Sequence, residues 1–92
     1  MSTVPIMIEV HLFGWLRRYG PTTDPTVECV VMAEAGPELR TVGDLVESLR
    51  IPLHEVASVF VDGRWQQAGL EAPLVGATRL GLFPPNMRLL YI

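Results

Sequence analysis

The sequence predicts a small α+β fold in which one β-sheet carries a single main helix. Apolar residues alternate with other residues in several short segments, as in strands with one face on a core. Between these segments, a helix N-cap precedes apolar residues at helical spacing. The chain has 92 residues, of which 49% are hydrophobic and 18% are charged. This balance excludes a disordered segment and suits one modest core, so we expect a single domain over residues 1–92.

The first half of the chain predicts two paired strands. Residues 6–13 alternate strictly and include several β-branched side chains, which favours a strand. A short helical turn is expected over residues 14–19, before a loop rich in Gly, Pro and Thr over residues 20–25. Alternation resumes over residues 26–34. A connection of only about a dozen residues makes an antiparallel pair the economical arrangement.

The clearest local feature is the start of the helix. Thr41 is a good N-cap residue, and Asp44 lies three positions later, where the acid of a capping box belongs. The apolar residues that follow recur at helical spacing and form one stripe. Pro52 opposes continuation of the helix. We therefore expect a helix over residues 42–50.

The second half of the chain predicts the remaining strands. Residues 57–61 form a short apolar segment, and Asp62-Gly63 is typical of a tight hairpin turn. Residues 64–67 can return as a short strand. The last core strand is expected over residues 78–83, because the two prolines that follow cannot donate to a strand ladder.

Short motifs in a fixed order resemble those of a known family. They are Leu12-Phe13-Gly14-Trp15-Leu16-Arg17, Thr41-Val42-Gly43-Asp44-Leu45, Val61-Asp62-Gly63, Pro73-Leu74-Val75-Gly76 and Leu82-Phe83-Pro84-Pro85. In this order the chain is similar to the ubiquitin-like (β-grasp) sulfur carriers, the small subunit of molybdopterin synthase and the thiamine-pathway sulfur carrier. The resemblance covers roughly residues 6–85. It implies a β-grasp fold with one mixed sheet and one main helix packed on it.

The chemistry of that family lies in a segment that this chain does not match. Family members end in Gly-Gly, a few residues after the two prolines, and an adenylating enzyme activates the terminal carboxylate for conversion to a thiocarboxylate. Residues 86–92 here are Asn-Met-Arg-Leu-Leu-Tyr-Ile and contain no glycine. We therefore expect a non-catalytic ubiquitin-like protein of the sulfur-carrier type that acts as a protein-interaction module. The alternative is a divergent sulfur carrier in molybdopterin or thiamine biosynthesis, activated by an adenylating enzyme at the carboxylate of Ile92.

The segment 86–92 is unusually apolar for a carrier tail. Burying two or three of its side chains contributes about 1.5–3 kcal/mol each, so we expect it to be ordered, as an added edge strand or docked on a partner. The predicted partner-binding residues are Phe83, Pro84, Leu89, Tyr91 and Trp65. The expected partner is an adenylating enzyme, a synthase large subunit or an oxidoreductase, or a second copy joined through this segment.

The remaining candidate residues favour structural roles. Cys29 lies among valines and suits a core position, and His11 suits a place on a sheet face. Trp15 and Trp65 are expected to pack in the core more readily than to anchor a partner. Because His54 and Glu55 lack a third group, they make a poor catalytic dyad. We expect no catalytic residues, no metal site and no cofactor.

The charge balance points away from nucleic acid and membranes. Ten acidic against seven basic residues give a net charge of −3, without the basic footprint of nucleic-acid binders. The longest uncharged stretches are far shorter than the roughly 18–20 apolar residues that a membrane span requires. A single cysteine excludes an internal disulfide, so we expect a cytoplasmic protein.

Overall fold

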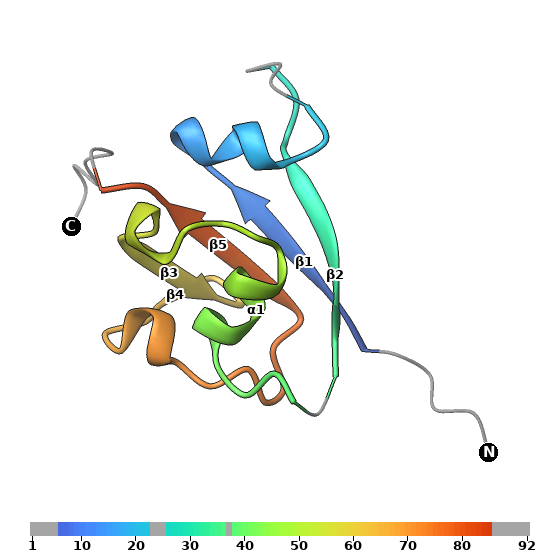
Figure 1. Ribbon diagram of the computed structural model, residues 1–92, viewed down its shortest axis with the longest axis vertical. Helices are drawn as coiled ribbons and strands as arrows, with labels where there is room; N and C mark the ends of the chain where they lie inside the picture. Colours follow the sequence, from blue (N-terminus) through green and yellow to red (C-terminus); the bar gives the residue numbers. More distant parts are fainter. Residues whose placement is uncertain (1–5, 23–25, 37, 86–92) are drawn as a thin grey trace.

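The computed structural model describes residues 6–22, 26–36 and 38–85. Figure 1 shows a curved sheet with helical segments packed across one of its faces. In chain order the elements are β1 (Ile6–Leu12), η1 (Gly14–Tyr19), β2 (Val30–Ala35), α1 (Val42–Ser48), η2 (Leu53–Glu55), β3 (Ser58–Val61), β4 (Arg64–Trp65), η3 (Gly69–Glu71) and β5 (Arg79–Phe83). The segments labelled η are short 3₁₀-helices, and α1 is the main helix among the described residues.

The sheet has the strand order β2-β1-β5-β3-β4. Neighbouring strands are antiparallel except for β1 and β5, which run parallel in the middle of the sheet. The predicted antiparallel pairing of the first two strands is therefore confirmed. So is the expected fold class, since one mixed sheet carries one main helix.

The core lies between α1 and the sheet face that α1 covers. Alternate residues of the central strands point into it and are nearly inaccessible to solvent. The buried apolar cluster comprises Ile8, Val10, Leu12, Leu16, Cys29, Ala33, Val42, Leu45, Val46, Ile51, Val56, Val59, Ala72, Leu74, Ala77, Leu80 and Leu82. The expectation that Cys29 is a core residue is confirmed.

The ends of α1 follow from local hydrogen bonds. Asp44 N–H donates to Thr41 Oγ1 at 3.2 Å, and Thr41 N–H donates to the Asp44 carboxylate at 3.2 Å, which completes the predicted capping box. The helix ends at Ser48, earlier than expected, because Arg50 adopts a left-handed backbone with φ 62°. Arg50 N–H and Ile51 N–H then bond back to the carbonyls of Glu47 and Val46, as in a Schellman motif.

The second strand starts later than the alternation predicted. β2 begins at Val30, whereas Thr26 lies in a turn and Val27 in a bend. Val27 is 51% exposed, and its carbonyl accepts a hydrogen bond from the guanidinium of Arg17. The ladder with β1 starts at the His11–Val30 pair, just beyond the hydrogen bond from Leu12 N–H to the Cys29 carbonyl at 2.9 Å.

The expected core packing of the tryptophans is wrong. Trp15 is 41% exposed and Trp65 is 57% exposed. In η1 it is Leu16, not Trp15, that enters the core. Trp65 lies opposite Phe60 in the β3–β4 pair, so it shares the sheet face that α1 does not cover.

The turn between β3 and β4 fixes the start of β5. Asp62 and Gly63 both have positive φ, 49° and 83°, as a tight hairpin turn requires. Asp62 Oδ1 accepts hydrogen bonds from Thr78 Oγ1 at 2.8 Å, from Thr78 N–H at 3.0 Å and from Arg79 N–H at 2.9 Å. The hydroxyl of Thr78, followed by these two N–H groups, lowers the pKa of Asp62 below its ordinary value of 3.8.

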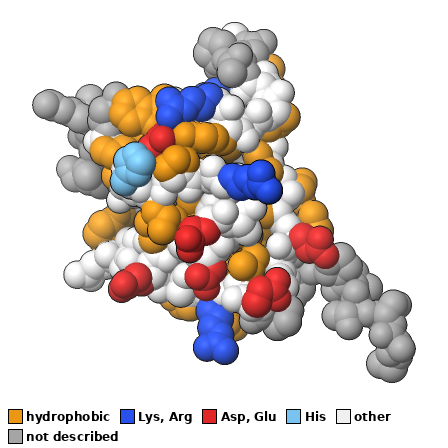
Figure 2. All heavy atoms as spheres, in the orientation of Figure 1, with side chains coloured by type: hydrophobic (Ala, Val, Ile, Leu, Met, Phe, Trp, Pro, Cys, Tyr) orange, Lys and Arg blue, Asp and Glu red, His pale blue; other side chains and the backbone are white. Residues whose placement is uncertain are grey.

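The helical side of the molecule carries many charged groups. Figure 2 shows this side, with acidic side chains gathered over its lower half around α1. Backbone N–H groups of Arg40 and Thr41 lower the pKa of Asp44, the acid of the capping box.

Within the described part of the chain, no helix has the length and apolar character needed to cross a membrane.

Asp62→Asn tests the turn through its pH dependence. The folded pKa of Asp62 lies below 3.8, so the contribution of its charge to stability is full above about pH 4. That contribution is lost as pH falls through the folded pKa. We expect the free energy of unfolding of Asp62→Asn to lie below that of the unmodified chain at pH 6 and to converge with it toward pH 2, in urea titrations. A difference independent of pH would contradict this account.

Candidate functional site

The face of the sheet turned away from α1 is the candidate site. The strand register brings one residue from each strand into a single cross-strand row. The row runs Val30, His11, Gly81, Phe60 and Trp65. We call this side the outer face, formed by Met7, Glu9, His11 and Phe13, by Val30, Met32 and Glu34, and by Ser58, Phe60, Trp65, Arg79, Gly81 and Phe83.

Aromatic rings surround a glycine at the centre of the outer face. Phe13 and Phe83 stack with ring centroids 4.3 Å apart, and Phe60 meets Phe83 edge-on at 5.3 Å. A Cβ atom built on Gly81 would lie 3.5 Å from the Phe13 ring, 3.5 Å from Phe60 Cβ and 3.7 Å from the Phe83 ring. The missing side chain therefore leaves a small depression between the three phenylalanines, which we call the Gly81 notch.

The Gly81 notch belongs to a groove of about 310 Å³. The groove is lined by His11, Phe13, Glu28, Phe60, Gly63, Arg79, Leu80, Gly81 and Phe83. A second hollow of about 190 Å³ shares His11, Phe13 and Glu28 with it and extends toward Arg17 and Val27. Together they form an elongated depression with an aromatic floor and charged groups at its margins.

The polar groups of the outer face lie at the side of the aromatic centre. Glu9 lies opposite Arg79 in the parallel β1–β5 pair, and its carboxylate is 3.5 Å from His11 Nε2.

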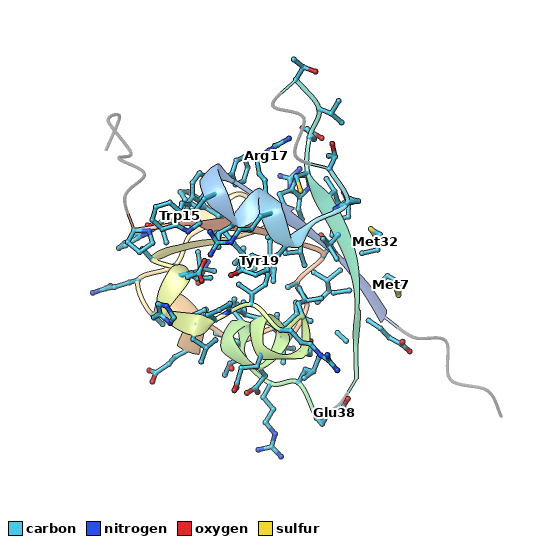
Figure 3. The ribbon with its side chains drawn as sticks, turned by 45° about the horizontal axis from the view of Figure 1, so that its top comes forward. Met7, Trp15, Arg17, Tyr19, Met32 and Glu38 are labelled. Atoms are coloured by element: carbon cyan, nitrogen blue, oxygen red, sulfur yellow. The ribbon has the colours of Figure 1, made fainter. Side chains whose placement is uncertain are left out.

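Two exposed methionines lie beyond these polar groups on the outer face. Met7 is 45% exposed and Met32 is 53% exposed. Figure 3 shows these methionines close together along β1 and β2, on the other side of the molecule from Trp15. Flexible thioether side chains adapt well to a binding partner.

The structure unites some of the predicted partner-binding residues. Phe83 and Trp65 both lie on the outer face and are joined through Phe60, which contacts the Phe83 ring and pairs with Trp65. Pro84 is fully buried, which removes its side chain from a contact surface. Leu89, Tyr91 and the carboxylate of Ile92 lie outside the described residues.

The centre of the site was not predicted from the sequence. Phe13, Phe60 and Gly81 were not proposed as contact residues, although each directly follows a buried residue, Leu12, Val59 or Leu80, in or at the end of a strand. Phe60 lies between Val59 and Val61, and Gly81 between Leu80 and Leu82. Applying the period of two to the outward residues as well as to the buried ones would have found all three.

A second polar cluster, on the helical side, serves the fold. The Glu55 carboxylate accepts hydrogen bonds from Arg18 at 2.6 Å and from the Tyr19 hydroxyl at 2.9 Å, which ties η1 to η2. His54 is not part of these contacts, so the adjacent His54 and Glu55 form no dyad. Across the described ranges, no three His, Cys, Asp or Glu side chains are grouped so as to hold a metal ion.

A mixed five-stranded sheet with one main helix on its inner face is the architecture of a ubiquitin-like domain of the β-grasp type. Comparison with protein-family models agrees, since the model described as Mut7-C ubiquitin matches residues 5–86. The chain belongs to the Mut7-C ubiquitin family. No curated protein and no solved structure gives a significant match.

Gly81→Ala tests whether the notch is an open space or a packing requirement. The added methyl group meets its neighbours at ordinary contact distance, and Gly81 does not have positive φ. We expect the free energy of unfolding to stay within about 1 kcal/mol of that of the unmodified chain. The matched control is Gly63→Ala, at φ 83°, which should destabilise by about 1 kcal/mol or more. Denaturant titration measures both, and a Gly81→Ala variant less stable than Gly63→Ala would contradict the geometry.

Proposed function

We propose that this chain is a non-catalytic ubiquitin-like module that binds another protein through the outer face of its sheet. The observation that carries the proposal is the Gly81 notch between Phe13, Phe60 and Phe83. A glycine at the centre of an aromatic cluster admits a side chain from outside. Well-packed pockets of this kind, rimmed by aromatic residues, are typical of the centres of protein interfaces.

The exposure of the outer face supports the same function. Trp65, Met7 and Met32 are all about half exposed, and they flank the aromatic centre on both sides. Apolar surface of this extent is costly to leave in water, and contiguous patches of it mark interaction sites. Among residues 6–22, 26–36 and 38–85, no helix or strand packs on this face.

The charge pattern of the face suits a partner with both signs of charge. Glu9, Glu28 and Glu34 lie along the β1–β2 side, whereas Arg79 lies beside the aromatic centre. Charged groups around an apolar centre orient a partner and contribute more to specificity than to affinity. The proposed partner therefore offers an apolar or aromatic side chain to the notch and polar groups to the margins.

Phe83→Ala and Trp65→Ala test the proposed surface. The partner is first identified by photo-cross-linking in cells, with a photoreactive phenylalanine analogue placed at position 65. Each alanine variant should then weaken binding of the purified partner about tenfold or more, because truncated aromatic anchors leave their pockets unfilled. Trp15→Ala is the matched control, because Trp15 is exposed and lines neither hollow.

The control variant should bind like the unmodified chain. Circular dichroism and the free energy of unfolding verify that all three variants are folded. Cross-links from position 15 rather than position 65, or unchanged affinity of both outer-face variants, would contradict the proposal.

A divergent sulfur carrier is the second candidate, favoured by the motif order. The Thr41–Leu45 motif begins α1 and the Leu82–Pro85 motif ends β5, which are the places that these motifs occupy in the resembling carriers. In those carriers the reactive terminus follows the two prolines. Residues 86–92 lack the glycines that let such a tail thread a narrow channel, so this candidate ranks below the binding module.

Intact-mass analysis separates the two candidates. The chain is incubated with ATP, a sulfur donor and the adenylating enzyme encoded in the same genome. A sulfur carrier gains about 16 Da when its terminal carboxylate becomes a thiocarboxylate. We expect no gain, whereas a carrier protein with a terminal Gly-Gly, treated in parallel with its own enzyme, shows it. A gain on this chain would favour the carrier function.

A further inference from the structure

We propose that the outer edge of β2 binds an extended, basic segment of a partner protein, which adds to the sheet as a further strand beside β2. This mode of binding uses the backbone of β2. It goes beyond the proposed function, which uses the aromatic centre of the outer face. β2 is separated from β5 and Gly81 by β1, so the two surfaces lie about 10 Å apart at the usual strand spacing.

The two ends of the sheet differ in how well they can accept another strand. The edge strands are β2 and β4, and Figure 1 shows β2 along the margin of the described sheet. β4 has two residues, whereas β2 has six and pairs with β1 in unbroken register. β2 contains neither proline nor lysine, and its register has no bulge; these are devices that commonly protect sheet edges. A long and regular edge of this kind is a template for another strand.

The backbone groups of alternate β2 residues face away from β1. Leu12 N–H donates to the Cys29 carbonyl at 2.9 Å, which makes these two residues a hydrogen-bonded pair of the antiparallel ladder. Such pairs recur at every second position, which leaves three β2 residues with outward backbone groups: Val30, Met32 and Glu34. Each offers one N–H donor and one C=O acceptor, and no described residue bonds to them.

The charge around this edge suits a basic partner. Residues 28–38, which include β2, contain three glutamates and no basic residue. Glu34 is exposed on β2, Glu28 precedes the strand, and Figure 3 shows Glu38 just beyond its other end. Glu9 adds a fourth carboxylate from the neighbouring strand β1. A cation opposite Glu34 completes an opposite-charge cross-strand pair, whereas the β2 strand of a second copy supplies none.

The side chains of β2 define the sequence pattern of the partner. In an antiparallel pair, the partner residues opposite Val30, Met32 and Glu34 share the outer face with them. Met32 is 53% exposed, and Figure 3 shows Met7 close to it, so an apolar side chain there covers adaptable thioether surface. The expected segment therefore has a basic residue opposite Glu34 and apolar residues two and four positions later, opposite Met32 and Val30.

A synthetic peptide with this pattern tests the edge directly. The probe is Arg-Thr-Ile-Thr-Val-Thr-Arg, acetylated and amidated at its ends and titrated into the ¹⁵N-labelled full chain. In the free chain, the amides of Val30, Met32 and Glu34 should exchange with solvent rapidly, whereas those of Val31 and Ala33, which face β1, should exchange slowly. Saturation with the peptide should slow the first three about tenfold or more.

Two N-methylated peptides form a matched pair. A methyl group on the nitrogen of the peptide's Ile removes the N–H that donates to the Met32 carbonyl, and should weaken binding about tenfold or more. A methyl group on the nitrogen of the central Thr, whose N–H points away from β2, should leave the affinity unchanged.

Charge reversal on the protein tests the preference for a basic segment. Glu34→Arg should weaken binding of the probe and strengthen binding of a peptide whose first Arg is replaced by Glu. Glu47→Arg is the matched control, because it changes the net charge equally at an exposed position of α1. The control should bind both peptides as the unmodified chain does.

Four results would overturn the inference. In the first, the probe shifts no amide signal of β2. In the second, the two N-methylated peptides bind equally well. In the third, Glu34→Arg and Glu47→Arg change the affinity equally. In the fourth, the amides of Val30, Met32 and Glu34 already exchange as slowly as that of Val31 in the free chain, which shows an edge paired within the chain or with a second copy.

The same samples separate this inference from the proposed function. If the probe pairs with β2 but Phe83→Ala and Trp65→Ala leave the affinity for the cross-linked partner unchanged, the proposed function fails and the inference stands. If these variants weaken partner binding but the probe leaves β2 unchanged, the inference fails and the proposed function stands.

Discussion

The central position of β5 is the constraint on which the rest of this structure depends. β5 pairs in parallel with β1 and antiparallel with β3. It therefore joins the β1–β2 pair and the β3–β4 pair into one sheet. Its inward residues, Leu80 and Leu82, are fully buried against the helical layer. The same pairing holds its outward residues, Gly81 and Phe83, at the middle of the opposite face. The strand that contributes Leu80 and Leu82 to the core therefore also presents the candidate binding surface on its other side.

The hydrogen bonds of the turn at Asp62 help to position the candidate surface. Its carboxylate holds the backbone of Thr78 and Arg79, where β5 begins, and Gly63 beside it lines the groove. A hydrogen-bonded turn thus sets both the register of β5 and one end of the groove. Because the aromatic rings come from β3, β5 and the residue after β1, the surface exists only when all these strands are in register.

Much of the fold could be predicted from local patterns. The capping box at Thr41, the hairpin turn at Asp62 and the alternation in β1 and β5 depend on residues close in sequence, and each was confirmed. The late start of β2 was not predicted, because the apolar alternation continues through residues 26–29, which lie outside the strand. The exposure of Trp65 depends on the side of the sheet that the helix covers, and that of Trp15 on which residue of η1 enters the core. Of the site, Phe83 and Trp65 were predicted, whereas the notch required the cross-strand register around Gly81.

The neighbours of Gly81 decide whether the outer face is arranged as described. Nuclear Overhauser measurements on a sample with labelled phenylalanine give the distances from the Gly81 α-protons to the protons of each phenylalanine. The structure predicts contacts to the rings of Phe13 and Phe83 and to the β-protons of Phe60, since these groups surround this one glycine. Two results would contradict the outer face as described: contacts from Gly81 to only one phenylalanine, or contacts from Gly81 to the residues of the buried core.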